Sequence, residues 1–229
     1  MQTTNLIEGI LLINKPKGCT SFSLVATLRR CLGVKKIGHA GTLDPFATGV
    51  MVLLVGRNYT RLSDNFLEKD KEYIAQLHLG IVTDTYDCEG AIQSQSPTIP
   101  TIEQVQEAIE QFQGDIDQIP PMYSAKKVKG KKLYELARRG IEIERAPVKV
   151  HLSIEIIHYA YPYLEIKVSC SKGTYIRSLA HDLGKVLECG AHLSALCRTR
   201  SGVFKLEDCL DGAALQCADV NLIDRLLTV

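Results

Sequence analysis

The sequence lacks the segments that direct a protein into or across a membrane. No apolar run approaches the roughly 18 residues that a membrane-spanning helix needs. The N-terminal residues MQTTNLIE have neither the basic start nor the apolar stretch of a signal peptide. The eight cysteines include no C-x-x-C pair, the spacing typical of zinc sites. The sequence therefore predicts a cytoplasmic protein with reduced cysteines and no bound metal.

Several common catalytic and ligand-binding motifs are also missing. The chain contains no GxGxxG, Walker A or GxSxG motif, so neither a nucleotide-cofactor enzyme nor a serine hydrolase is indicated. The acidic stretch 83–90 (TDTYDCEG) lacks the spacing and the terminal glutamate of an EF-hand loop. A calcium site is therefore not predicted there.

The net charge is only +1, but acidic and basic residues are unevenly distributed, and basic residues are missing from one stretch. Residues 101–117 hold five acidic residues and no basic one, whereas residues 123–149 hold nine Lys or Arg and three Glu. In 123–149 the basic residues alternate with Tyr123 and Tyr134, a pattern that suits phosphate contacts and base stacking on RNA. The alternative is a solvated basic loop.

Length and patterning indicate an α+β fold. The 229 residues are 45% hydrophobic, which fits one large domain or two small ones. Alternating or continuous apolar residues predict strands at 9–14, 50–55, 71–80, 148–158, 163–170 and 191–204. Helical spacing predicts helices at 22–31, 59–67, 133–139, 174–188, 211–216 and 220–227. Irregular alternation of these elements favours a mixed, mostly antiparallel sheet with flanking helices.

Capping residues set the expected limits of two helices. Ser21 is expected to cap the 22–31 helix, which Gly33 ends, with Leu24, Leu28 and Cys31 facing the core. Thr101 and Gln104 form a capping box for a further helix that Gly114 closes.

The loop 38–49 (GHAGTLDPFATG) is the strongest candidate for chemistry. Pro45 disfavours the helical region for Asp44, and the glycines allow close approach of a ligand. A carboxylate in a stiff loop at the mouth of a buried strand is placed as a catalytic group would be. The alternative is a surface loop with an Asp turn.

Three other residues have two interpretations each. Arg177 lies in the first turn of a predicted helix, where the dipole disfavours a cation, so it is either a functional cation or a solvated arginine. Tyr73 is either a core residue or a ring that stacks on a flat substrate. His39 is either a structural loop residue or a contact to a base or phosphate.

Seven segments together resemble the TruB-type tRNA pseudouridine synthases in order and spacing. The resemblance runs from about residue 9 to residue 205, and its most specific parts are the GH-x-G-x-LDP loop and CSKGTYIR. The segments are 9–18 (GILLINKPKG), 38–49, 71–75 (KEYIA), 83–90, 120–125 (PPMYSA) with 130–134 (GKKLY), 169–177 (SCSKGTYIR) and 191–200 (AHLSALCRTR).

The resemblance implies a pseudouridine synthase fold and an activity. The expected reaction isomerises uridine to pseudouridine at position 55 in the T loop of tRNA, without cofactor or metal. The target base is expected to flip from its stack. Asp44, Tyr73 and Arg177 are the implied catalytic residues, with Arg177 as the cation that favours the ionised Asp44 carboxylate. The implied substrate-binding residues are His39, Lys15, Tyr175, Leu196, Lys126, Lys127, Lys131 and Lys132.

The domain organisation implied by the resemblance is one catalytic domain, 1–229, with an RNA-binding insertion near 123–149. Many bacterial relatives continue into a PUA domain. The stretch 206–229 is acidic and is too short to form one. A monomer acting alone on the tRNA T stem-loop is expected. Two alternatives stay open: a partner- or guide-dependent synthase, and an RNA-binding or tRNA-folding protein on the same scaffold.

Overall fold

The computed structural model describes residues 7–67, 70–128, 130–216 and 221–228, and it divides into two compact units. Unit 1 comprises Met1–Tyr73 and Cys197–Val229, and unit 2 comprises Ile74–Leu196. The boundary falls within β4 (Lys71–Leu79) and within β12 (Ala191–Ser201). Lys129 and residue 220 of the predicted 220–227 helix lie outside the described residues.

Unit 1 is built on two buried antiparallel strands, β1 (Gly9–Lys15) and β3 (Thr48–Val55). Both strands are continuous apolar runs, as strands covered on two faces require. The strand order is β14-β1-β3-β12, with β2 (Ile37–His39) paired to β3 and β13 (Phe204–Lys205) paired to β12. The short strand β14 (Leu210–Asp211) runs parallel to β1.

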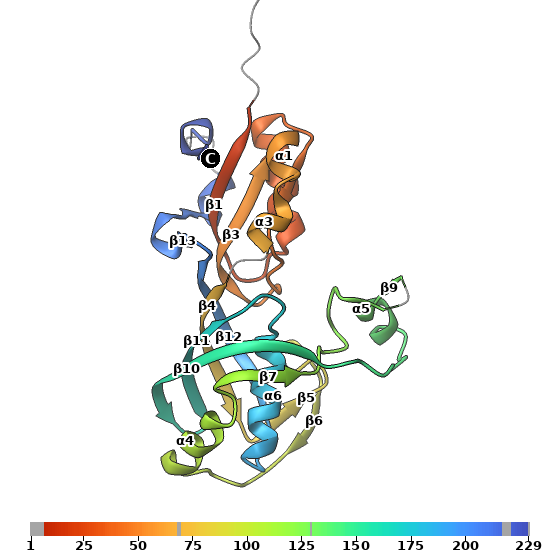
Figure 1. Cartoon of the computed structure of the whole chain (residues 1–229), viewed down its shortest axis with the longest axis vertical. Helices are drawn as coiled ribbons and strands as arrows, with labels where there is room; N and C mark the ends of the chain where they lie inside the picture. The colour runs from red at the N-terminus through yellow and green to blue at the C-terminus, as the bar shows by residue number, and fades with distance from the viewer. Residues whose placement is uncertain (1–6, 68–69, 129, 217–220, 229) are drawn as a thin grey trace, which may run out of the picture. The chain divides into compact units, whose positions relative to one another are not determined.

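The helix α1 (Ser21–Leu32) lies beside the β1–β3 pair (Figure 1) and buries Leu24, Val25 and Leu28. It ends at Gly33, whose positive φ of 66° makes the left-handed cap that was predicted. Two details of the prediction are wrong. Thr20 rather than Ser21 caps the helix, and Cys31 is exposed because it lies off the buried stripe.

The rest of unit 1 is made of short elements. The predicted 59–67 helix is two helices, α2 (Arg57–Thr60) and α3 (Ser63–Leu67). The C-terminal segment forms 3₁₀ turns rather than α-helices: η1 (Leu206–Asp208), η2 (Gly212–Gln216) and η3 (Ile223–Arg225). Within the described ranges, no helix combines the length and apolarity that crossing a membrane would require.

Unit 2 continues with the strand order β12-β4-β11-β10-β7, whose long antiparallel pair is β10 (Val148–Ala160) with β11 (Tyr163–Cys170). In β4, alternate residues are buried, as the period-two pattern predicted. The α+β class and the mostly antiparallel sheet are thus confirmed; the ladders β1–β14 and β3–β12 are parallel.

The helices of unit 2 are α4 (Ile102–Glu110), α5 (Leu133–Ala137) and α6 (Ile176–Val186). The Thr101–Gln104 capping box of α4 is confirmed. Gly114 does not close α4, which ends at Glu110; it begins β7 (Gly114–Gln118), a strand the sequence did not predict. Two small hairpins complete the unit: β5 (Ile81–Thr83) with β6 (Ile92–Gln95), and β8 (Lys127–Val128) with β9 (Lys131–Lys132).

Candidate active site

The loop that carries Asp44 connects β2 to β3 in unit 1. Its apolar residues Leu43, Phe46 and Ala47 are buried, whereas Asp44 itself is partly exposed. The amide of Ala47 donates to the carbonyl of Asp44 at 3.1 Å, so Asp44 is the first residue of a turn centred on Pro45 and Phe46. Buried side chains on both sides of the turn thus fix a carboxylate that reaches the surface.

A buried lysine is hydrogen-bonded to the backbone of this loop. Lys15 is 0% exposed, and its ammonium donates to the carbonyls of Pro16 at 3.0 Å, Cys19 at 2.7 Å and Pro45 at 3.1 Å. The amide of Gly18 also donates to Pro45, at 2.8 Å. Lys15 therefore ties the segment after β1 to the Asp44 turn, which is a positioning role.

The start of α1 makes a second attachment. The hydroxyl of Ser21 donates to the carbonyl of Leu43 at 3.1 Å and accepts from its amide at 2.9 Å. Ser21 is 3% exposed, so this exchange satisfies polar groups that burial would otherwise leave unpaired. Both backbone polar groups of Leu43, the residue immediately before Asp44, are thereby held by one side chain.

A buried arginine from β12 closes the loop at its other end. Arg198 is 1% exposed, and its guanidinium donates to the carbonyls of Val50 at 2.8 Å and Gly41 at 3.4 Å. Its backbone pairs with Gly49 in the parallel β3–β12 ladder. Sequence reasoning missed Arg198; the available signal was a charged residue in the middle of a strand with buried neighbours.

His39 ends β2 and is partly exposed. Burial, and secondarily the charge of Arg198, lowers the pKa of His39, so the imidazole is neutral near pH 7. Its Nδ1 is buried without a hydrogen-bond partner among the described residues. A neutral ring suits contact with a base better than pairing with a phosphate.

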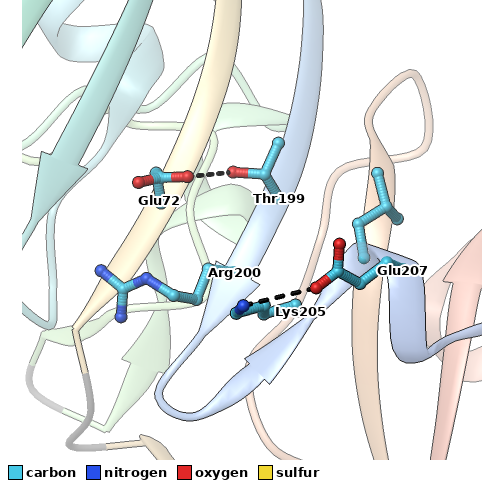
Figure 2. Close-up of a pocket in the computed structure, with 6 residues that line it drawn as sticks. Glu72, Thr199, Arg200, Lys205 and Glu207 are labelled. Atoms are coloured by element: carbon cyan, nitrogen blue, oxygen red, sulfur yellow. Dashed lines mark hydrogen bonds and ion pairs between the residues drawn. The ribbon is translucent and has the colours of Figure 1, made fainter.

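Tyr73 points to the buried side of β4 and is 7% exposed. The opposite side of β4 contributes Glu72 to a cavity of about 330 Å³ (Figure 2). The charged groups of this cavity are engaged with neighbours: Thr199 donates to Glu72 at 2.9 Å, and Lys205 pairs with Glu207 at 3.3 Å. None of the predicted site residues lines it.

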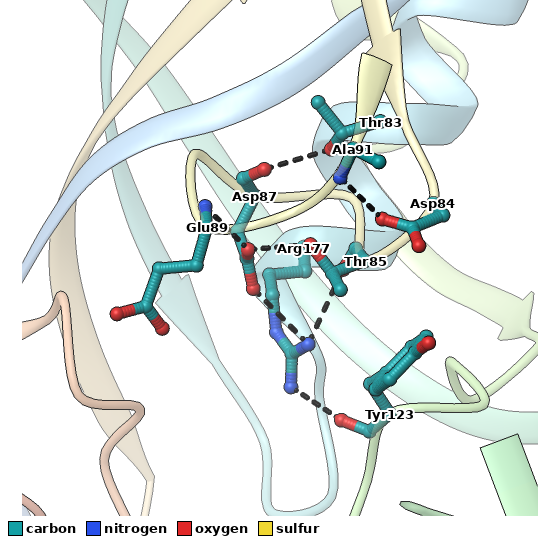
Figure 3. Close-up of polar contacts among 8 residues, drawn as sticks. All are labelled: Thr83, Asp84, Thr85, Asp87, Glu89, Ala91, Tyr123 and Arg177. Atoms are coloured by element: carbon teal, nitrogen blue, oxygen red, sulfur yellow. Dashed lines mark hydrogen bonds and ion pairs between the residues drawn. The ribbon is translucent and has the colours of Figure 1, made fainter. Parts of the chain in front are cut away.

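In unit 2, Arg177 lies in the first turn of α6 and is 6% exposed, which rules out a solvated surface arginine. Its guanidinium forms an ion pair with Asp87 at 3.3 Å and donates to the carbonyls of Thr85 at 3.2 Å and Tyr123 at 2.8 Å (Figure 3). These contacts hold the guanidinium in one orientation.

The polar loop 83–90 is built to present Asp87. The Asp87 carboxylate accepts from the Thr85 hydroxyl at 2.6 Å and from the Glu89 amide at 3.0 Å, and Thr83 donates to its carbonyl at 2.7 Å (Figure 3). Sequence reasoning rejected this loop as a calcium site and included it among the segments that carry the family resemblance, but it did not single out Asp87. Its acidic composition was the signal, but no pattern in the sequence links it to Arg177.

A ring stack fixes the other side of this loop. Tyr86 has a positive φ of 64° and stacks on His181 of α6, with ring centroids 3.7 Å apart and planes 10° apart. Burial, and secondarily the charge of Lys185, lowers the pKa of His181 to about 4. The imidazole is therefore neutral at physiological pH, and the stack carries no buried charge.

The basic stretch 123–149 is anchored at the start of α6. Gln118 exchanges hydrogen bonds with the backbone of Tyr175, at 2.8 and 3.1 Å, and Ser178 donates to the carbonyl of Ile119 at 2.9 Å. The carbonyl of Tyr123 accepts from the Arg177 guanidinium. The segment that enters the basic stretch is thus attached to the same helical turn that carries Arg177.

Within the stretch, the predicted lysines surround the β8–β9 hairpin. Lys127 and Lys131 are exposed, whereas Lys126 and Lys132 are partly exposed. The Lys132 ammonium lies 5.3 Å from the Tyr134 ring centroid, and the Arg138 guanidinium lies at the same distance. The two remaining predicted residues of unit 2 differ in exposure: Tyr175 is partly exposed and Leu196 is 8% exposed.

Comparison with known proteins matches two family models across the chain. The model of the TruB family pseudouridylate synthase (N terminal domain) matches residues 29–176, and that of the tRNA pseudouridylate synthase B C-terminal domain matches residues 177–227. A curated tRNA pseudouridine synthase B from Protochlamydia amoebophila is 70% identical over 96% of this chain and 84% of its own length. One from Chlamydia abortus is 60% identical over 96% and 93%.

Solved structures give the same fold. A chain in a Cbf5-Nop10-Gar1 complex superposes with a TM-score of 0.72 at 28% identity, and one in an H/ACA RNP bound to a substrate RNA with 0.69 at 25%. Each comparison covers 96% of this chain. The chain spans 59% of the length of each of these two solved chains.

The close contact between Gly49 and the Arg198 backbone predicts how the substitution of Gly49 by Ala changes stability. Gly49 has φ +106°, and an added Cβ would lie 2.6 Å from the Arg198 amide nitrogen and closer still to its carbonyl oxygen. We expect Gly49→Ala to lower the free energy of unfolding by more than the ~1–3 kcal/mol that backbone strain alone would cost. Denaturant unfolding measures this change. Gly33→Ala is the matched control, because Gly33 also has positive φ but nothing within 4 Å. An equal decrease in the free energy of unfolding for the two variants would show that the contact with Arg198 does not restrict position 49.

Proposed function

Because this chain belongs to the TruB family of pseudouridylate synthases, we propose that it isomerises uridine to pseudouridine at position 55 in the T loop of tRNA. The relatives named tRNA pseudouridine synthase B match nearly all of the chain. The observation that carries the proposal is the Asp44 turn, a partly exposed carboxylate held from three sides by Lys15, Ser21 and Arg198.

The reaction leaves the atomic composition of the substrate unchanged, although one hydrogen is exchanged. The bond between uracil N1 and ribose C1′ breaks, the base rotates, and a bond forms between C5 and C1′. The proton on C5 is then lost and N1 gains one. In this proposal Asp44 attacks the sugar or the base, and both routes require an ionised carboxylate. A permanent cation favours that form, and we assign this role to Arg177.

The substrate must leave its stack before it reaches a carboxylate in a turn. Flipping a nucleotide costs a few kcal/mol. We propose that Tyr73 stacks on the flipped uracil and that the neutral His39 contacts the displaced bases. Tyr175 and Leu196 are proposed to contact the substrate nearby. The resemblance implies neither cofactor nor metal, and we take the enzyme to be a cytoplasmic monomer.

Phosphate contacts offset the cost of flipping. The β8–β9 hairpin presents Lys126, Lys127, Lys131 and Lys132, and we propose that these residues bind the RNA backbone. Because the stretch begins at Tyr123, which accepts from Arg177, RNA held here is held beside a residue of the proposed chemistry.

Asp44→Asn tests the catalytic assignment, because it keeps the shape of the side chain and removes its charge. We expect pseudouridine formation in a tRNA transcript to fall on the order of a thousand-fold or more, as when a catalytic nucleophile is removed. Binding of the same tRNA should change by less than about twofold. Asp64→Asn, an exposed carboxylate of the same unit, is the control and should retain activity. An Asp44→Asn enzyme that still forms pseudouridine at the wild-type rate would refute the assignment.

Replacing Lys126, Lys127, Lys131 and Lys132 together by Gln tests the RNA contact. We expect weaker tRNA binding and a flatter dependence of log K on log salt, by about 0.7–0.9 for each phosphate that is no longer neutralised. Filter binding at several salt concentrations measures both. A salt slope equal to that of the wild-type protein would show that these lysines do not contact phosphate.

A further inference from the structure

The N-terminal part of unit 1 carries a charge imbalance that the proposed site does not use. Between residues 9 and 63 the sequence has eight Lys or Arg, and Asp44 is its single acidic residue. Two of the eight have structural roles: Lys15 is buried, and Arg29 donates to the carbonyl of Ile37 at 3.0 Å. The other six are exposed: Lys17, Arg30, Lys35, Lys36, Arg57 and Arg61.

These six cations have no acidic partner within the described part of the chain, since none of them lies within ion-pair distance of a carboxylate there. By contrast, Lys149, Lys185 and Lys205 each have an acidic partner within 4.0 Å. Unpaired cations on one side of a fold attract a polyanion.

Five of the six converge on the N-terminal end of β2. The amide of Gly56 donates to the carbonyl of Lys36 at 2.8 Å, which places Lys35 and Lys36 beside the start of α2. Arg57 and Arg61 are four residues apart and share one helix face. The Arg29–Ile37 bond brings the last turn of α1, with Arg30, to the same place. We name these five residues, Arg30, Lys35, Lys36, Arg57 and Arg61, the β2 basic patch.

Glu8, an acidic residue beside the patch, is already hydrogen-bonded. The carboxylate of Glu8 accepts from the backbone amides of Arg57 at 3.0 Å and Asn58 at 3.4 Å, and from the Asn58 side chain at 2.6 Å. It therefore satisfies the orphan amides at the start of α2. The arginine and lysine side chains of the patch remain available to another molecule.

The patch lies at the opposite end of the strands from Asp44. In the β1–β3 ladder, Lys15 pairs with Gly49 at the Asp44 end, whereas Gly9 pairs with Val55 at the patch end. The seven residues from Gly49 to Val55 are separated by six steps, which span about 20 Å at ~3.3 Å per residue. That length corresponds to about seven base pairs of an A-form RNA duplex, which rises ~2.8 Å per base pair.

We propose that the β2 basic patch binds the phosphodiester backbone of the substrate tRNA about seven base pairs away from the target uridine. The inference rests on the proposed function, because that function supplies the polyanion and places its target base at Asp44. It adds a second region of backbone contact, on the unit that carries Asp44 and separate from the 123–149 stretch. A helical extension of the T stem is the part of tRNA that would reach it.

The test compares full-length tRNA with a T-arm hairpin of about five base pairs, which stops short of the patch. For Lys35→Gln/Lys36→Gln and for Arg57→Gln/Arg61→Gln, we expect tRNA binding to weaken three- to tenfold and the salt slope to fall by about one to two. Hairpin binding should stay within twofold of wild type. The matched control is Lys185→Gln/Lys205→Gln, which removes the same charge from ion-paired sites. Its affinity for tRNA and for the hairpin should equal that of the wild-type protein.

Two results would overturn the proposal. Wild-type tRNA affinity and salt slope in both patch variants would show that the patch does not contact RNA. Equal weakening for tRNA and hairpin would show that the contact is not distant from the target. Circular dichroism confirms that the variants are folded. Failure of the proposed function is read separately, as a wild-type protein that binds tRNA without forming pseudouridine.

Discussion

The buried ammonium of Lys15 is the interaction on which the proposed active site depends. It has no exposed surface, and three carbonyls from two segments surround it. Burying an ammonium costs several kcal/mol unless its three protons are bonded, so the two segments are held where their carbonyls converge. One of those carbonyls belongs to Pro45, the residue after Asp44. The carbonyls that surround the buried ammonium of Lys15 thus set the position of the Asp44 carboxylate.

Unit 2 uses a similar device for its own cation. Arg177 is buried and is bonded by Asp87, Thr85 and Tyr123. A buried ion pair adds little net stability, but removal of one partner is costly because it leaves an isolated charge. The arrangement therefore fixes orientation more than it stabilises the fold. Since Tyr123 begins the basic stretch, the same guanidinium also connects the proposed RNA contact to α6.

Local patterns in the sequence were sufficient for most elements and insufficient for what positions the site. Alternation in 71–79 and the Thr101–Gln104 capping box are local, and both were predicted. β7 was not, because its charged residues gain strand structure only by pairing with β10. The partners of the site are distant in sequence: Arg198 lies 148 residues from Val50, and Arg177 lies 92 from Thr85. Such pairs leave no periodic signal in a single sequence.

The most direct test of the central claim is release of tritium from tRNA labelled at uracil C5, with the purified protein and no other component. Formation of the C5–C1′ bond expels the C5 hydrogen, so the account predicts release of about one equivalent per tRNA. It also predicts that the release disappears when uridine 55 alone is replaced. No release from a transcript that the protein binds, or release that persists without uridine 55, would contradict the account.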